Sequence, residues 1–121
     1  MSAHPALVAD VLALTVEHEA FGADQLVDGE PTSGWVPLTG LDGIEIGVWE
    51  MTPGVITDIE ADEVFCVLAG RARVEFVDPP AIPIDLRAGT LVRLHEGWRT
   101  RWTVTQTIRK IAVTPGEEPT R

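Results

Sequence analysis

The stretch that decides the fold runs from Gly54 to Gly70, G-V-I-T-D-I-E-A-D-E-V-F-C-V-L-A-G. It contains a cluster of four carboxylates, Asp58, Glu60, Asp62 and Glu63. An unbroken apolar run, residues 64–69, follows the cluster and ends at a glycine. An apolar run this short, rich in Val and Phe and bounded by charge and glycine, is typical of a buried β-strand. We therefore expect the carboxylates at the mouth of a cavity or on a surface rim.

The size and charge of the chain limit its class and its partners. Its 121 residues, 45% of them hydrophobic, fit one globular domain with one hydrophobic core. Lys and Arg number 9 against 19 Asp and Glu, which gives a formal net charge of −10. A nucleic-acid partner requires clustered basic side chains that neutralise phosphates, so we expect none. The simplest role of the acidic surface is solubility.

The chain offers few groups for disulfide, zinc or membrane chemistry. Cys66 is its only cysteine, which excludes an internal disulfide and a multi-cysteine zinc site. Because Cys66 lies in an apolar run, we expect it to act as a small hydrophobic side chain. The N-terminus has no basic segment, and no apolar run approaches the ~20 residues that cross a bilayer. A cytoplasmic protein without a membrane partner is expected.

Short segments of β-type sequence, separated by turn signals, occupy most of the chain. Strands are expected at residues 35–38, 44–51, 64–69, 71–77, 82–86, 91–95, 101–105 and 107–113. Gly70 permits a tight turn between two of them, and Asp78-Pro79-Pro80 ends the second because two prolines remove two ladder donors. About eight short strands with turns between them predict an all-β sandwich or barrel.

The N-terminal segment carries a different pattern. Apolar side chains within residues 5–20 recur near helical spacing, at Leu7, Val8, Val11, Leu12 and Val16. This spacing favours a short N-terminal helix. The alternation of Leu12, Leu14 and Val16 leaves open a strand that crosses to a partner subunit.

Four blocks of the sequence resemble the cupin superfamily of small jelly-roll barrels. They are G-V-W-E-M-T-P-G (47–54), E-V-F-C-V-L-A-G-R-A-R-V (63–74), L-R-A-G-T-L-V-R-L-H-E-G-W-R-T-R-W-T-V (86–104) and T-I-R-K-I-A-V (107–113). They are most similar to the single-domain group related to ethanolamine-utilisation cupins and (S)-ureidoglycine aminohydrolases. The resemblance implies a cupin jelly roll over 29–114, preceded by a helix or arm over 1–28 and followed by a tail over 115–121.

The first cupin motif, G-x5-H-x-H-x3,4-E-x6-G, is matched only at its ends. Gly54, Glu63 and Gly70 occupy its first glycine, its glutamate and its last glycine. The middle is shorter than the motif requires, and Glu60 and Asp62 stand in the region of its two histidines. Of the metal ligands in this motif, the glutamate alone remains.

The second motif, G-x5-P-x-G-x2-H-x3-N, is also incomplete. Gly89 and Gly97 fit its glycines, whereas His95 stands at the proline position, Thr100 at the histidine position and Val104 at the asparagine position. All three histidine ligands of the cupin site are therefore absent. Because transition metals favour imidazole nitrogen, the resemblance implies a degenerate metal site without a bound cofactor.

Strand parity locates the candidate pocket. If Glu63 faces the barrel interior, as the resemblance implies, Phe65 and Val67 face it too, while Thr100 and Trp102 share a side of a later strand. The expected ligand-binding residues are Trp49, Glu63, Phe65, Trp98, Thr100 and Trp102. A carboxylate in an apolar barrel is stabilised by a nearby cation or donor. The candidates for that cation are Arg93, Arg99 and Arg101.

Two functions involve this pocket. The preferred one is binding of a small organic ligand, with Glu63 as its polar anchor. The alternative is an enzyme, a hydrolase or isomerase resembling the ureidoglycine aminohydrolase-type or sugar-modifying cupins. In that case Glu63 or His95 acts as general acid or base. A divalent ion, if one binds, is expected at Glu60, Asp62, Glu63 and His95.

A third function is structural. The outward side of residues 64–68 is apolar and, together with the N-terminal segment, suits an interface between two copies of the chain. Two-fold symmetry is the commonest arrangement of soluble oligomers, so a homodimer is expected. A monomeric mass in light scattering at micromolar concentration would exclude this role.

Overall fold

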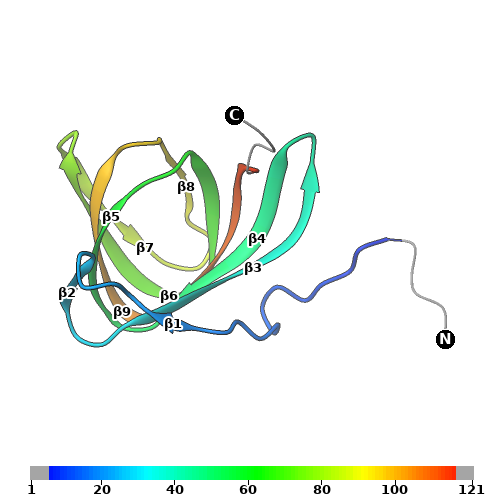
Figure 1. Cartoon of the computed structure of the whole chain (residues 1–121), viewed down its shortest axis with the longest axis horizontal. Helices are drawn as coiled ribbons and strands as arrows, with labels where there is room; N and C mark the ends of the chain where they lie inside the picture. The colour runs from blue at the N-terminus through cyan, green and yellow to red at the C-terminus, as the bar shows by residue number, and fades with distance from the viewer. Residues whose placement is uncertain (1–5, 117–121) are drawn as a thin grey trace.

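Two long strands, β6 (Glu63–Asp78) and β9 (Arg99–Pro115), pair with each other antiparallel along almost their whole length (Figure 1). We call this pair the spine. The structure is a computed structural model that describes residues 6–116. Its strands are β1 (Glu19–Ala20), β2 (Leu26–Asp28), β3 (Thr32–Leu41), β4 (Ile44–Met51), β5 (Gly54–Ile59), β6 (Glu63–Asp78), β7 (Ala81–Leu86), β8 (Leu91–Leu94) and β9 (Arg99–Pro115). The predicted all-β fold is confirmed, and the segment predicted at 44–51 is β4.

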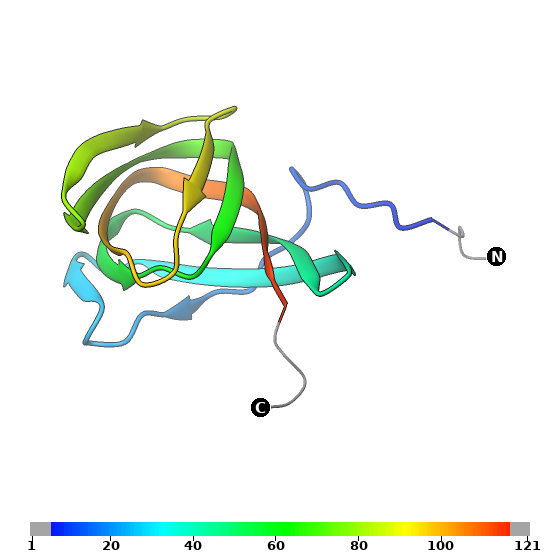
Figure 2. The same cartoon turned by 90° about the horizontal axis from the view of Figure 1, so that it is seen from above.

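The pairing around β9 makes the sheet curl into an open barrel. On one edge β9 pairs with β6, and on the other it pairs first with β5 and then with β4. The far edge of β6 carries β8 and β7, while β3 and β1 extend the sheet beyond β4. Figures 1 and 2 show these strands wrapped around a common interior. The inner face of β9 therefore lies between side chains from β4, β5 and β6.

Along the two spine strands, side chains alternate between the interior and the outside, and those that point inward form the core. Phe65 and Val67 of β6, and Trp102, Val104 and Ile108 of β9, are each at most 3% exposed. Their neighbours of opposite parity, such as Cys66, face the outside and are more exposed. Complete burial of a side chain of this size stabilises the fold by roughly 1.5–3 kcal/mol. The inward parity predicted for the two strands is confirmed.

Gly70 does not form the predicted turn. It lies inside β6, which continues from Glu63 to Asp78, and β9 likewise runs through the break predicted at Gln106. Gly70 has φ of 92°, and the pairing with β9 shifts register around it. A Cβ atom at this position would lie 2.1 Å from the carbonyl oxygen of Thr107. The glycine therefore marks a bulge where two backbones approach closely, which is the other meaning of glycine in a strand.

The predicted N-terminal helix is wrong. Within the described part of the segment, the amides of Ala13 and Leu14 both bond to the Asp10 carbonyl, which closes a single turn. The Asp10 carboxylate also accepts a hydrogen bond from the Leu12 amide, a local bond that competes with helix continuation. The rest of the segment is an extended arm, and the view from above shows it leaving the barrel (Figure 2).

Contacts with the outer face of the sheet explain why the arm is extended. Val16 is buried there, and a Cβ atom on Gly34 would lie 1.9 Å from the Glu17 carbonyl oxygen. The His18 ring donates to Glu50 at 2.7 Å. Burial raises the pKa of Glu50, but hydrogen bonds from His18 and Arg109 outweigh it and hold that pKa below its ordinary value. The arm is thus extended because its packing against the sheet and the His18–Glu50 pair outweigh the helical spacing of its apolar residues.

Several expectations stay predictions. Among residues 6–116, no helix is long and apolar enough to span a bilayer. The cytoplasmic location and the domain boundaries are not tested by the fold. Residues 117–121 of the predicted tail and residue 5 of the predicted helix lie outside the described residues. The arm exposes Leu7, Val8 and Leu12, which suits the expected homodimer, but the dimer itself stays a prediction.

The close approach at Gly70 gives a testable consequence. Gly70→Ala should lower the free energy of unfolding by more than about 2 kcal/mol, because it adds a backbone clash to the strain of positive φ. Gly89→Ala is the matched control: its φ is 94°, yet its Cβ would meet nothing within 4 Å. Urea unfolding of both variants measures the difference. Equal losses would show that strain alone, without the contact, accounts for Gly70.

Candidate functional site

A buried ion pair lies on the inner face of the spine. Lys110 of β9 has the inward parity of Ile108 and Ala112, and its Nζ donates to Oε2 of Glu63, at the start of β6, at 2.5 Å. The Lys110 side chain is 7% exposed and the Glu63 side chain 17%. Burying a lone ammonium is costly, so the carboxylate is the partner that permits its position.

Three aromatic rings surround the same ammonium. The Nζ of Lys110 lies 4.1 Å from the ring centroid of Phe65, 4.7 Å from that of Trp49 and 4.9 Å from that of Trp102. The negative face of an aromatic ring attracts a cation, most strongly when water is excluded. The rings and the carboxylate together hold a positive charge inside the barrel.

The prediction that an arginine supplies the cation beside Glu63 is wrong. Arg93 pairs with Asp62 at 3.3 Å, and Arg101 lies 4.0 Å from Glu75; both pairs are on the outside of the molecule. Arg99 is exposed as well. Alternation along β9 explains this, because its odd-numbered arginines, 99 and 101, face away from the interior. The partner of Glu63 is Lys110, which the sequence analysis did not consider.

Glu60 is a second buried carboxylate, at 7% exposure. Its Oε2 accepts a hydrogen bond from the Thr100 hydroxyl at 2.5 Å and another from the Trp102 indole N–H at 3.0 Å. Its backbone is also fixed, because its amide donates to the carbonyl of Trp98 and its carbonyl accepts from the amide of Gly97. These four hydrogen bonds hold Glu60 rigidly beside β9.

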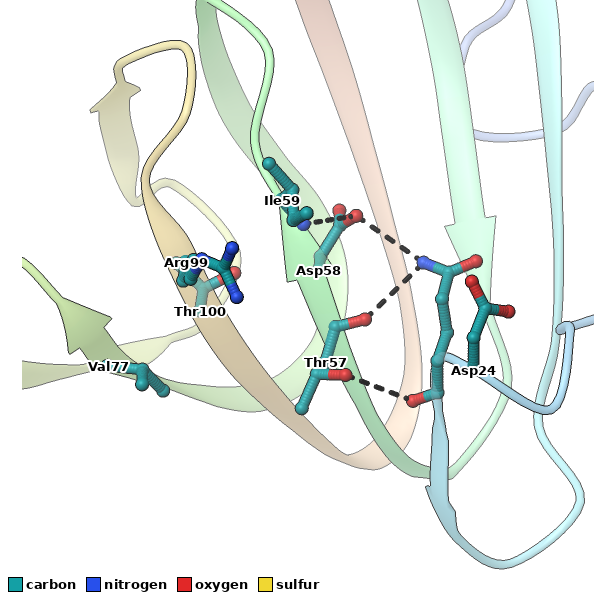
Figure 3. A pocket seen from close by; sticks show the side chains of 8 residues that line it. Asp24, Thr57, Asp58, Ile59, Val77, Arg99 and Thr100 are labelled. Carbon is teal, nitrogen blue, oxygen red and sulfur yellow. Dashed lines mark hydrogen bonds between the residues drawn. The ribbon is translucent and has the colours of Figure 1, made fainter.

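Asp58 is a third carboxylate in the same region. Burial, followed by repulsion from Glu60, raises the pKa of Asp58 from its ordinary value of 3.8 to about 6. The hydrogen bond from the Ile59 amide and the charge of Lys110 act in the opposite direction. The Asp58 carboxylate accepts a hydrogen bond from that amide at 2.9 Å, and another from the side-chain amide of Gln25 at 3.4 Å. Figure 3 shows the first of these between Asp58 and Ile59.

These charged groups line one cavity of about 270 Å³. Its polar wall is formed by Gln25, Asp58, Glu60, Glu63 and Lys110, and its aromatic wall by Phe21, Trp35, Trp49 and Trp102. A few polar groups set among aromatic side chains are typical of ligand pockets. We call this space the barrel cavity.

A second space of about 420 Å³ adjoins the barrel cavity and is drawn in Figure 3. The two share Gln25, Asp58 and Ile59. The other residues that line this outer groove include the exposed side chains of Val77 and Arg99. The Lys110–Glu63 pair and the tryptophan rings line the barrel cavity and not this outer groove, so the barrel cavity is the candidate site.

The structure brings some of the predicted site residues together. Glu63, Trp49 and Trp102 line the barrel cavity. Phe65 lies against the ammonium of Lys110 without lining that cavity, and the Thr100 hydroxyl is occupied by Glu60.

Two predicted site residues lie elsewhere. Trp98 packs edge-on against Phe76, with 6.1 Å between ring centroids, and its other neighbour is the ring of His95 at 4.6 Å. His95 is exposed. Neither residue lines the barrel cavity that contains Glu63, so the proposed acid–base residues Glu63 and His95 do not share a site.

The candidate metal ligands do not form a metal site. Asp62 points outward, where hydrogen bonds from the Glu96 amide and then Arg93 lower its pKa. Glu60 is occupied by neutral donors, Glu63 by an ammonium, and His95 stacks on a ring. Across residues 6–116, no group of three or more His, Cys, Asp or Glu side chains is arranged to hold a metal ion. The residues present therefore do not fit the metal of the wider superfamily.

Sequence reasoning missed Lys110, Trp35 and Phe21 as cavity residues, whereas Asp58 belongs to the carboxylate cluster that was expected at a cavity mouth or a surface rim. A signal existed for Lys110, since residues 107–113 alternate and place it on the side of Ile108. No comparable signal existed for Phe21 and Trp35. They reach the cavity because of the path of the chain around the barrel, which local patterns do not specify.

The comparisons with known proteins agree with this architecture. The family model described as EutQ-like cupin domain matches residues 38–112. Similar solved structures include the EutQ protein of Clostridium difficile, at 19% identity and a TM-score of 0.59, covering 81% of this chain and 80% of that one. A cupin-2 domain containing protein from Shewanella frigidimarina matches at 17% identity and a TM-score of 0.55, covering 68% and 79%.

A cupin superfamily protein from Desulfitobacterium hafniense matches at 15% identity and a TM-score of 0.55, covering 70% of this chain and 78% of that chain. No curated protein matches the chain. Identities this low show the fold alone. The predicted cupin jelly-roll fold is confirmed.

The buried pair predicts strong coupling between two substitutions. Lys110→Met leaves the Glu63 carboxylate without its cation and should cost about 3 kcal/mol of unfolding free energy. Adding Glu63→Gln removes the stranded charge, so the double variant should lose less than the sum of the two single losses. Arg73→Met and Asp85→Asn form the matched control, because that pair is exposed and should couple by less than about 1 kcal/mol. Additive losses at Lys110 and Glu63 would contradict the interpretation.

The raised pKa of Asp58 predicts a pH-dependent stability. The folded state holds the proton more tightly than the unfolded state, so this stabilisation is complete below about pH 3.8 and is lost as the pH rises through about 6. Asp58→Asn should therefore gain stability relative to the unsubstituted protein between about pH 4.5 and 7.5. The gain should be on the order of 1 kcal/mol, because partial exposure screens the charge.

Urea unfolding at the two pH values measures the Asp58 effect. Asp85→Asn removes an exposed carboxylate and is the control. An Asp58→Asn difference that is the same at both pH values would contradict the prediction.

Proposed function

The chain belongs to the EutQ-like cupin domain family, and from this premise we propose that it binds a small organic molecule in the barrel cavity without a metal ion. The observation that supports the proposal is the cavity itself, where a buried Lys110–Glu63 pair meets several tryptophan rings. Apolar walls with a few fixed polar groups are the usual construction of a small-molecule site.

The size of the cavity supports a ligand of metabolite size. Small-molecule pockets typically measure about 300–1,000 Å³, and the barrel cavity, at about 270 Å³, lies just below that range.

The Lys110 ammonium supports the metal-free part of the proposal. It holds Glu63, the residue at the glutamate position of the cupin motif, and supplies a positive charge beside that carboxylate. An ammonium group donates hydrogen bonds but has no coordination positions for a ligand. Binding therefore depends on hydrogen bonds, charge and ring contacts.

The same pair changes the role expected for Glu63. Its Oε2 is occupied by Lys110, so Glu63 fixes the ammonium in position and is not the free polar anchor that the sequence suggested. The groups that remain for a ligand are the unused N–H donors of Lys110 and the carboxylates of Asp58 and Glu60. A reaction forms no part of the proposal.

A blocked cavity tests the proposed function. A library of small sugars, acids and amines is screened by thermal shift, and each hit is measured by calorimetry with and without EDTA. Ala61 is an exposed residue on the cavity wall, so Ala61→Phe should narrow the entrance and weaken every hit by about ten-fold or more. EDTA should change nothing.

Ala81→Phe is the matched control, because Ala81 is equally exposed but lies on β7, away from the cavity. It should leave the affinities unchanged. Hits that bind Ala61→Phe as well as the unsubstituted protein, or that require a metal removed by EDTA, would refute the proposal.

A further inference from the structure

The charges in the barrel cavity do not balance. Lys110 and Glu63 neutralise each other as a pair. Asp58 and Glu60 also line the cavity, and no other Lys, Arg or His among residues 6–116 lines it with them. Two carboxylates therefore face this space without a cation of their own.

Glu60 is positioned to receive a donor from the cavity. Both of its hydrogen bonds from side chains, those of Thr100 and Trp102, go to Oε2. Its Oε1 accepts no hydrogen bond from any residue in the described part of the chain, although the residue is only 7% exposed. Among the described residues no buried side-chain oxygen lacks a partner, so this Oε1 is reached by solvent and is open to a donor that enters the cavity.

Asp58 adds a second negative charge beside it. Its carboxylate repels that of Glu60, and within the described residues 6–116 the only side chain that bonds to it is the neutral amide of Gln25. A neutral amide does not cancel charge. A cation placed between Asp58 and Glu60 would relieve their repulsion, whereas an anion would increase it.

The aromatic wall favours the same kind of ligand. Trp35 lines the cavity and is 37% exposed, and Phe21 lies on the same wall. Neither ring is engaged by the Lys110 ammonium, which lies over other rings. The large apolar face of a tryptophan ring is suited to packing against the apolar part of a ligand. The cavity thus combines free carboxylates with free ring faces.

We propose that the ligand of the barrel cavity is a small organic cation, an amine whose ammonium group lies against Asp58 and Glu60 and whose apolar part packs on Trp35. The inference rests on the proposed function, which it narrows to one class of ligand. The Lys110–Glu63 pair is neutral as a whole, so the uncompensated negative charge of the cavity lies at Asp58 and Glu60. The charged end of the ligand is therefore directed toward Asp58.

Two series of matched compounds test the charge preference. Each series keeps the apolar part constant and varies the charge: benzylamine, benzyl alcohol and benzoate, then butylamine, butan-1-ol and butyrate. Calorimetry at about pH 7.5, together with quenching of tryptophan fluorescence, measures binding to the full chain. The amine of at least one series should bind at least about ten times more tightly than its alcohol and its acid.

Variants test the position of the charge. Asp58→Asn and Glu60→Gln should each weaken the amine by about ten-fold or more, and added salt should weaken it further. Asp85→Asn, an exposed carboxylate outside the cavity, is the control and should have no effect. Glu60→Gln loses a charged acceptor of two buried donors and is first checked for folding, whereas Asp58→Asn retains its hydrogen-bond acceptor.

The outcomes separate this inference from the proposed function. Failure of both amines to bind, or binding that Asp58→Asn leaves unchanged, overturns the amine class. An alcohol or acid that binds as tightly as its amine also overturns it, and if Ala61→Phe abolishes that binding the proposed function still stands. If no compound of these series or of the wider library binds the cavity, both proposals fall.

Discussion

A single buried ammonium organises the interior of this barrel. Lys110 is tolerated there because Glu63 and three ring faces surround its charge, and these partners come from three different strands. β4 supplies one ring, β6 supplies the carboxylate and another ring, and β9 supplies the third ring and the lysine itself. Since a lone buried charge would be expelled or neutralised, the pairing of these three strands and the position of the charge depend on each other.

The length of β9 makes this arrangement possible. One continuous strand carries Thr100 and Trp102, which hold Glu60, and eight residues further along it carries Lys110, which holds Glu63. The two acidic residues come from the loop and strand start that follow β5, so a short acidic segment is attached at two points to one rigid strand. The close approach of backbones at Gly70 keeps β6 beside β9 over that whole distance. The pairing of β6 with β9 therefore fixes the positions of the charged side chains in the cavity.

Sequence patterns predicted those features of the structure that follow from the alternation of inward and outward side chains along a strand. The inward parity of Phe65 and Trp102, and the strand from Ile44 to Met51, follow from two-residue alternation. Gly70 was misassigned because glycine permits both a turn and a bulge, and only its close approach to the backbone of Thr107 distinguishes them. The N-terminal helix failed because contacts of the arm with the sheet outweigh local spacing. Lys110 was missed because a basic residue next to Arg109 resembles a solvated pair, although the two point to opposite faces.

The cupin fold hosts many chemistries, so the site and not the barrel must carry any functional argument. In a metal-containing barrel, a divalent ion draws several protein ligands to one point and leaves positions for a substrate. In the function proposed here, the ammonium of Lys110 needs only the carboxylate of Glu63 as a partner. Asp58 and Glu60 are therefore not needed to balance its charge. Asp58 and Glu60 then face the cavity as uncompensated charges. In the proposed function the Lys110–Glu63 pair is neutral as a whole, so the uncompensated carboxylates of Asp58 and Glu60 set the charge of the ligand that the cavity prefers.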